Sequence, residues 1–204
     1  MQIPLIESYS SAQLEEARKW PAIQRYLSII ERSPTSFSER LRWQRHHAWL
    51  RAALATCHEA ATAKDVCEFW SQEAEKLILE ANQEAGTEQF CILALGKLGA
   101  CELNLSSDVD LIFARPDDSD FEQKRMRDFQ SLLSEHTSFG FALRVDLNLR
   151  PGGRSSALVP TQSEFEYHYG YQGEMWERLA FVRMRILSGP EKLTDDINTF
   201  SRKF

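Results

Sequence analysis

The chain has 204 residues, a length that fits one domain of ordinary size or a small helical module joined to a compact catalytic one. Apolar residues make up 43% of it and charged residues 26%, so the sequence can bury a sizeable core and global disorder is not expected. The net charge of −6 argues against a nucleic-acid partner, because such partners normally meet a basic surface.

Cysteine usage and hydropathy predict a cytoplasmic protein. The 4 cysteines form no C-x-x-C pair and show no zinc-type spacing, which indicates a reducing compartment. The segment from Met1 to Tyr9 lacks the basic start and the long apolar core of a signal peptide. No apolar stretch approaches the ~20 residues that a membrane helix needs, so no membrane partner is expected.

Residues 1–86 are predicted to form a helical region. Ser10 and Gln13 can make a capping box at the start of a helix that runs toward Ile30. Pro21 interrupts that helix and divides it in two, because a proline cannot donate the hydrogen bond that a helix interior requires.

Two longer helices are predicted next, because apolar residues recur at helical spacing over residues 39–61 and again over residues 65–82. Gly86 ends the second of them, and the sequence pattern then changes from helical to strand-like. We therefore expect a domain boundary at this glycine, with a second domain over residues 87–204.

Three segments of this second region are predicted to be strands. Residues 90–95 form a continuous apolar run that fits a buried strand, and residues 109–113 form a second run of this kind. Residues 144–150 alternate strictly between apolar and polar side chains, which is typical of a half-buried strand with one polar face. We expect a small mixed or antiparallel sheet.

Helices are predicted between and after these strands. Ser119 and Glu122 form the pattern of a capping box, as do Thr161 and Glu164, and each pair precedes a helical segment. Residues 174–187 are predicted to form one further helix. The fold class is therefore α+β, with a helical N-terminal region and helices packed on the sheet.

Two aspartates that are two positions apart mark the candidate catalytic site. Asp108 and Asp110 point to the same side of a strand, and like charges that close repel each other unless a cation lies between them. Asp146 lies on the polar face of the alternating strand and reaches the same place if the two strands are neighbours. Three carboxylates suit Mg²⁺, which prefers oxygen ligands. Alone, an Asp-x-Asp pair is a weak signal.

The segment before these aspartates supplies candidate phosphate-binding groups. Gly96 and Gly99 allow the backbone to approach a phosphate closely, and Lys97 offers a positive charge. Ser107 belongs to the same candidate set and shapes the turn before the strand, rather than acting as a nucleophile. Together with the aspartates, these residues are the parts of two-metal phosphoryl or nucleotidyl transfer. The chain has no Rossmann or P-loop motif.

Arginines are concentrated in one stretch of this acidic chain. They are Arg144, Arg150, Arg154, Arg178, Arg183 and Arg185. They predict either a phosphate-binding wall or a solvated surface that pairs with Glu174 and Glu177. We favour phosphate binding for Arg150, which shares a strand face with the third aspartate, and both interpretations stay open for Arg178. Trp176 is predicted to be a core anchor rather than a platform for a nucleobase.

Several of these segments, in the same order, resemble the bacterial glutamine synthetase adenylyltransferase/adenylyl-removing family, which belongs to the DNA polymerase beta-like nucleotidyltransferase superfamily. The segments are GKLG (96–99), ELNLSSDVDLIF (102–113), RVDLNLRP (144–151) and QGEMWER (172–178). The resemblance covers roughly residues 90–189 and implies that residues 87–204 form a nucleotidyltransferase-like catalytic domain. Two positions depart from the family pattern, Ala100 and Gly152, and neither of them is a metal ligand.

This resemblance implies an activity and a partner. Family members carry two related domains, of which one attaches AMP to a tyrosine of glutamine synthetase with ATP and the other removes it by phosphorolysis, which releases ADP. Residues 102–107 and 169–178 resemble the removing domain more closely. The resemblance therefore implies a Mg²⁺-dependent enzyme that binds glutamine synthetase, nucleotide and phosphate.

The alternatives are the attaching reaction and a binding domain without turnover, since family proteins are several times longer than this chain. An unrelated nucleotidyltransferase acting on RNA or a small molecule is disfavoured by the acidity of the chain and by the match around Trp176.

Overall fold

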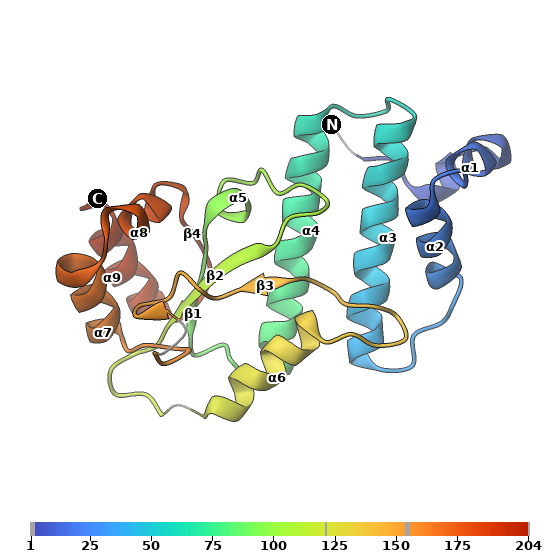
Figure 1. The fold of residues 1–204 in the computed structure, drawn as a ribbon. Helices are drawn as coiled ribbons and strands as arrows, with labels where there is room; N and C mark the ends of the chain where they lie inside the picture. Colours follow the sequence, from blue (N-terminus) through green and yellow to red (C-terminus); the bar gives the residue numbers. More distant parts are fainter. Residues whose placement is uncertain (1–2, 121, 154–155, 204) are drawn as a thin grey trace.

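The computed structural model describes residues 3–120, 122–153 and 156–203. At its centre is a four-stranded sheet in the order β3-β2-β1-β4 (Figure 1). The strands are β1 (Cys91–Ala94), β2 (Val109–Ala114), β3 (Val145–Asp146) and β4 (Arg185–Ser188). β1 pairs antiparallel with both β2 and β4, whereas β2 and β3 are parallel. The prediction of an α+β fold with a small mixed sheet is therefore confirmed.

The N-terminal region is helical, as predicted. It consists of a short 3-10 helix η1 (Ile6–Ser8) and of α1 (Ser11–Ala17), α2 (Pro21–Ile30), α3 (Phe37–Cys57) and α4 (Ala63–Glu84). The capping box of Ser10 and Gln13 is present at α1, and Pro21 is the first residue of α2. The sequence analysis missed a second capping box, in which Thr62 and Asp65 begin α4.

Helices cover both faces of the sheet, which explains why β1 is apolar along its whole length. α3, α4 and α6 (Gln123–Ser134) lie on one face, and the C-terminal helices lie on the other (Figure 1). The C-terminal helices are α7 (Gln162–Tyr167), the π-helix η3 (His168–Gln172), α8 (Met175–Ala180), the 3-10 helix η4 (Phe181–Arg183) and α9 (Glu191–Ser201).

Alternate residues of β1 contribute to two separate cores. Ile92 and Ala94 pack toward α3, α4 and α6, whereas Cys91 and Leu93 pack toward the C-terminal helices. Each fully buried aliphatic side chain stabilises the fold by ~1.5–3 kcal/mol relative to an exposed one. α3 and α4 share the first core with the sheet. The sheet, which carries Asp110 and Asp146, is therefore held against the N-terminal helices. The division at residue 86 stays a prediction.

The predicted helix over residues 174–187 is wrong. α8 ends at Ala180, one turn of 3-10 helix follows, and residues 185–188 become β4, which pairs with β1. The edge of the buried strand β1 offers backbone hydrogen bonds that a helix cannot use, so tertiary pairing overrides the helical periodicity.

Two further local predictions need correction. Ser119 does not cap α6: its hydroxyl donates to the Pro116 carbonyl at 2.7 Å, and the helix begins without a side-chain cap. The strand predicted over residues 144–150 contains only β3. Directly after it the Asn148 N–H donates to the Asp146 carboxylate at 2.7 Å, which turns the chain away from the sheet.

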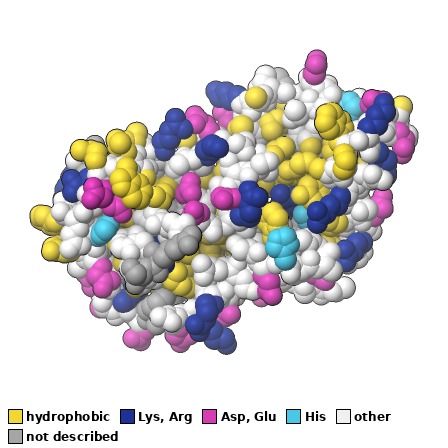
Figure 2. Space-filling model, in the orientation of Figure 1, with side chains coloured by type: hydrophobic (Ala, Val, Ile, Leu, Met, Phe, Trp, Pro, Cys, Tyr) yellow, Lys and Arg dark blue, Asp and Glu magenta, His cyan; other side chains and the backbone are white. Residues whose placement is uncertain are grey.

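The C-terminal helices expose apolar side chains. Figure 2 shows them gathered on the left of the view, over the elements that follow α7. Trp176 is 58% exposed and is therefore not the predicted core anchor, because α8 buries none of its side chains fully. Among the described residues, no helix combines the length and apolar character needed to cross a lipid bilayer.

Candidate active site

Strand pairing brings two of the predicted aspartates together. In the parallel pair of β2 and β3, Asp110 lies directly beside Asp146. Side chains at paired positions of neighbouring strands leave the same face of the sheet. Asp108 lies two residues before the first of them, where the Val109 N–H still pairs with the Arg144 carbonyl at 2.9 Å. The three predicted carboxylates thus meet at one end of β2.

The carboxyl of Asp110 is perturbed by burial and by its charged neighbours. Partial burial raises the pKa of its carboxyl above the usual range, and the negative charges of Asp146 and Asp108 raise it further. The nearby ammonium group of Lys97 acts in the opposite direction and lowers the pKa. Three acids that repel one another at the edge of a sheet create a place where a cation is favoured.

Asp108 already has a cationic partner within the chain. The guanidinium Nε of Arg144 lies 2.5 Å from the Asp108 Oδ1, and its Nη2 donates to the Ser106 carbonyl. Both side chains of the pair are about half exposed, with relative accessibilities of 54% and 53%. The sequence analysis had left Arg144 as either part of a phosphate-binding wall or a surface residue paired with Glu174 and Glu177, and had missed this contact. The sequence nevertheless contained a signal for this contact, because Arg144 shares a predicted strand face with Asp146, and Asp146 was predicted to reach Asp108.

The site is therefore not assembled as a ready cation cage. Within the described ranges, no three His, Cys, Asp or Glu side chains are already grouped around one point as ligands. Asp108 faces Arg144, and Asp146 accepts the Asn148 N–H. The donor chemistry nevertheless fits an oxygen-preferring divalent ion, since all three groups are carboxylates and Asp110 carries unfavourable negative neighbours.

The two glycines of the predicted phosphate loop have different roles. Gly96 begins α5 (Gly96–Gly99) with a φ of +53°, and a Cβ at this position would lie 2.7 Å from the Asp110 Oδ2. A side chain here would collide with the carboxylate, so glycine is required at the site itself. Gly99 packs elsewhere: its Cβ would lie 1.9 Å from the Arg183 carbonyl oxygen, which explains this glycine by backbone packing.

Lys97 and Ser107 lie together beside the acids. The Lys97 Nζ donates to the Ser107 Oγ at 3.1 Å, which links α5 to the loop that leads into β2. The lysine side chain is exposed, and its charge acts on Asp110. These two polar groups are therefore accessible to a ligand that approaches the carboxylates.

The remaining predicted phosphate ligands are engaged with the backbone. Arg150 is only 7% exposed, and its Nη1 donates to the Leu147 carbonyl at 2.8 Å. Arg178 lies on α8, where its Nη2 donates to the Gly170 carbonyl at 3.3 Å. Arg154 lies outside the described residues.

Two more arginines of that stretch form ion pairs. Arg183 pairs with Glu102 at 2.5 Å, and Arg185 pairs with Glu75 at 2.6 Å. Both contacts connect the C-terminal part of the chain to segments that precede β2, so these guanidinium groups hold elements together.

Comparison with known proteins identifies one family. A family model described as glutamate-ammonia ligase adenylyltransferase matches residues 4–199. The chain is 35% identical to the bifunctional glutamine synthetase adenylyltransferase/adenylyl-removing enzyme of Pseudomonas aeruginosa, over 76% of this chain and 18% of that protein. It is 34% identical to the enzyme of the same name from Mannheimia haemolytica, over 80% of this chain and 20% of that protein. The chain thus spans only a small part of the relatives it matches.

Proposed function

Since this chain belongs to the glutamate-ammonia ligase adenylyltransferase family, we propose that it removes AMP from a tyrosine of adenylylated glutamine synthetase by phosphorolysis. The names of the relatives, which include an adenylyl-removing activity, supply the substrate. The observation that carries the proposal for this chain is the direct pairing of Asp110 with Asp146, with Asp108 two residues away. These three residues are the proposed Mg²⁺ ligands and catalytic carboxylates.

The proposed reaction exchanges one phosphorus–oxygen bond for another. An oxygen of hydrogen phosphate forms a bond to the AMP phosphorus, the bond from that phosphorus to the tyrosine oxygen breaks, and the tyrosine oxygen takes up the proton that the phosphate loses. The products are ADP and the unmodified tyrosine. When bound, Mg²⁺ neutralises negative charge on the in-line oxygens, which is worth several kcal/mol in reactions of this class.

Lys97 is the proposed phosphate-binding cation. It is exposed, its charge acts on Asp110, and the Ser107 hydroxyl beside it offers a second hydrogen-bond donor. Arg150, the other candidate, is buried and donates to a backbone carbonyl, so its proposed contribution is to hold the chain that follows β3. Gly96 leaves the Asp110 carboxylate uncovered on the side of α5.

The attaching reaction is the second candidate, because the relatives are named as bifunctional enzymes. In it the tyrosine oxygen attacks the α-phosphorus of ATP and pyrophosphate leaves. Binding without turnover is the third candidate, favoured by the ion pair that holds Asp108 on Arg144. Both alternatives use the same carboxylates, so the products distinguish them.

Product analysis tests the proposal. The chain is incubated with adenylylated glutamine synthetase, phosphate and Mg²⁺, and in parallel with unmodified glutamine synthetase and ATP. We expect ADP in the first reaction and none after Asp146→Asn, whereas Asp128→Asn, an exposed change on α6, should retain the activity. Pyrophosphate from the second reaction alone would favour attachment. The absence of both products from folded protein would favour a binding domain.

A further inference from the structure

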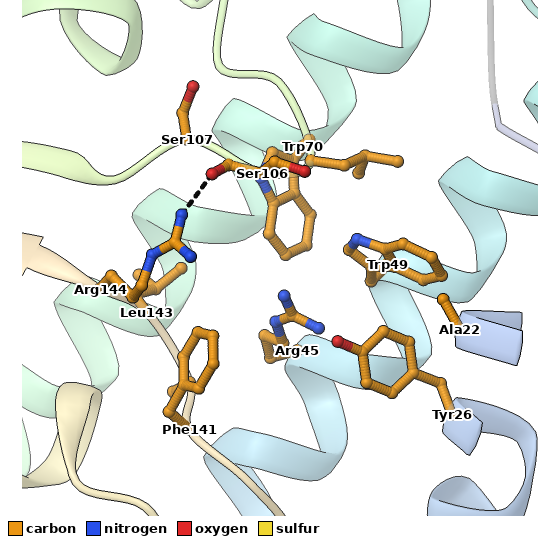
Figure 3. Close-up of a pocket in the computed structure, with 12 residues that line it drawn as sticks. Ala22, Tyr26, Arg45, Trp49, Trp70, Ser106, Ser107, Phe141, Leu143 and Arg144 are labelled. Atoms are coloured by element: carbon orange, nitrogen blue, oxygen red, sulfur yellow. Dashed lines mark hydrogen bonds between the residues drawn. The ribbon is translucent and has the colours of Figure 1, made fainter.

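A cavity of about 360 Å³ lies next to the carboxylates, between the N-terminal helices and two loops of the sheet region. Helices α2, α3 and α4 form one side of it, and residues 105–107 and 141–144 form the other. Figure 3 shows aromatic side chains around its centre. These are Tyr26, Trp49, Trp70 and Phe141. The volume is in the range of small-molecule sites, ~300–1,000 Å³.

The charge of this cavity is unusual for an acidic chain. Its described lining includes two arginines, Arg45 and Arg144, and no acidic residue. Arg45 is only 6% exposed, and its guanidinium lies among the rings in Figure 3. Its carbon is 5.1 to 5.5 Å from the ring centroids of Tyr26, Trp70 and Phe141. The aromatic faces therefore stabilise the cation only in part.

The guanidinium of Arg45 has neutral polar partners and no carboxylate partner among the described residues. Its Nη1 lies 3.1 Å from the His46 Nδ1, and burial lowers the pKa of this histidine to about 4, so the ring is neutral at pH 7. The Nε has no hydrogen-bond partner within the described part of the chain. The Tyr26 side chain hydrogen-bonds the guanidinium, but no Asp or Glu of the described residues pairs with it, and Arg144 and Arg25 lie close enough to repel it. A buried charge without a counter-ion is costly unless something pairs with it.

We propose that this cavity binds an aromatic oxyanion, a flat ring that carries a phosphate or a carboxylate. The oxyanion pairs with the guanidinium groups of Arg45 and Arg144, and the ring packs against Trp49 and Trp70. A planar guanidinium matches a carboxylate or a phosphate with two hydrogen bonds, and aromatic walls favour a ring over a chain.

Binding in this cavity has a consequence for the carboxylates, and this part rests on the proposed function. Arg144 is at the rim, and its Nε contacts Asp108 at 2.5 Å. An oxyanion that pairs with Arg144 weakens this contact and leaves Asp108 free to join Asp110 and Asp146 around a cation. The aromatic oxyanion therefore raises the affinity of the carboxylates for a divalent ion.

The first test measures binding in metal-free buffer by tryptophan fluorescence, since Trp49 and Trp70 line the cavity. The probes are phenyl phosphate, AMP, benzoate and inorganic phosphate. We expect phenyl phosphate or AMP to change the fluorescence and inorganic phosphate to bind at least about tenfold more weakly, because it lacks a ring. Arg45→Met should weaken binding by about 10- to 100-fold, the value of a lost charge-assisted hydrogen bond.

Comparison among the probes identifies the ligand class. Tighter binding of AMP than of phenyl phosphate favours a purine, and tighter binding of phenyl phosphate than of benzoate favours a phosphate. Equal affinity of the wild type and Arg45→Met for the tightest probe would refute the site. Equal affinity for inorganic phosphate and phenyl phosphate would refute the aromatic part, and no binding of any probe at millimolar concentration would refute the whole proposal.

The second test follows Mn²⁺ binding by electron paramagnetic resonance, with and without the tightest probe. We expect the probe to raise Mn²⁺ affinity in the wild type. Arg144→Gln should bind Mn²⁺ more tightly than the wild type and lose the effect of the probe. Arg183→Gln is the matched control, because its pair with Glu102 has the same 2.5 Å distance and similar exposure, 55% and 59%.

These tests distinguish failure of the proposed metal site from failure of the proposed cavity site. An absence of Mn²⁺ binding would contradict the metal site and leave the fluorescence result standing. Mn²⁺ affinity that is the same with and without the probe would refute the link between the cavity and Asp108.

Discussion

Two buried arginines lie one helical turn apart on α3 and have opposite surroundings. Arg42 is fully buried where α3 meets α6, and all of its nitrogens donate hydrogen bonds. Its acceptors include the backbone carbonyls of Ser38, Ser131, Leu132, Glu135 and Gly140. Arg45, in the cavity, has rings around it, a hydrogen bond with the Tyr26 side chain and a neutral histidine at one nitrogen, and its Nε has no partner within the described residues. All nitrogens of Arg42 therefore have acceptors within the protein, whereas the Nε of Arg45 has none among the described residues.

This difference separates a structural charge from a functional one. Arg42 closes the C-terminal end of α6 and the loop after it, where helix carbonyls lack partners of their own. The region of Arg45, Arg144 and the three aspartates contains like charges that repel one another, and Arg45 has no carboxylate partner among the described residues. Natural proteins tolerate such groups mainly at functional sites.

The largest effect on stability is expected at Arg42, where all the guanidinium nitrogens have acceptors. Arg42→Met should lower the free energy of unfolding by about 3–5 kcal/mol, because it leaves several buried carbonyls without a donor. Urea unfolding at pH 7 measures this change. A loss of less than about 1 kcal/mol would show that water or other donors replace the guanidinium, and the contrast between the two arginines would disappear.

An intermediate effect is expected at Asp110. Because burial and two acids raise the pKa of this carboxyl in the folded state, protonation stabilises the fold, and this contribution is lost as pH rises through the raised pKa. Asp110→Asn should therefore be more stable than the wild type at pH 7 without metal. The advantage should vanish below the unfolded-state pKa of ~3.9.

Thermal unfolding across this pH range, with and without Mg²⁺, measures the effect of Asp110→Asn. Added Mg²⁺ should raise the melting temperature of the wild type more than that of the variant. If the variant melted well below the wild type at pH 7 in both conditions, Asp110 would be a structural residue.

The smallest effect on stability is expected at Arg45. Arg45→Met should stay within about 1 kcal/mol of the wild type, because the lost cation–π contacts and the lost hydrogen bond with Tyr26 are offset by removal of a buried charge without a carboxylate partner. Urea unfolding of this variant beside Arg42→Met makes a matched comparison, since the same side chain is introduced on the same helix. A loss as large as that of Arg42→Met would make Arg45 a structural residue.

Local chemistry determined much of this protein from the sequence alone. Ser10 and Thr161 cap helices because their hydroxyls satisfy backbone N–H groups a few residues away, and such bonds need no distant partner. The apolar runs that became β1 and β2 indicated burial on both faces. The spacing of Asp108 and Asp110 predicted that both acids leave the same side of a strand, and in the structure β2 begins directly after Asp108 and contains Asp110.

Tertiary structure decided those features that depend on residues far away in the sequence. Residues 185–188 form a strand because β1 has a free edge beside them, which no helical periodicity reveals. Trp176 is exposed because α8 lies on the outside of the fold, although its side chain is large and apolar. Arg42 and Arg45 are both cations on the same helix, and only the carbonyls brought by α6 distinguish them. Charges acquire their roles from neighbours that are remote in sequence, and the fold alone supplies those neighbours.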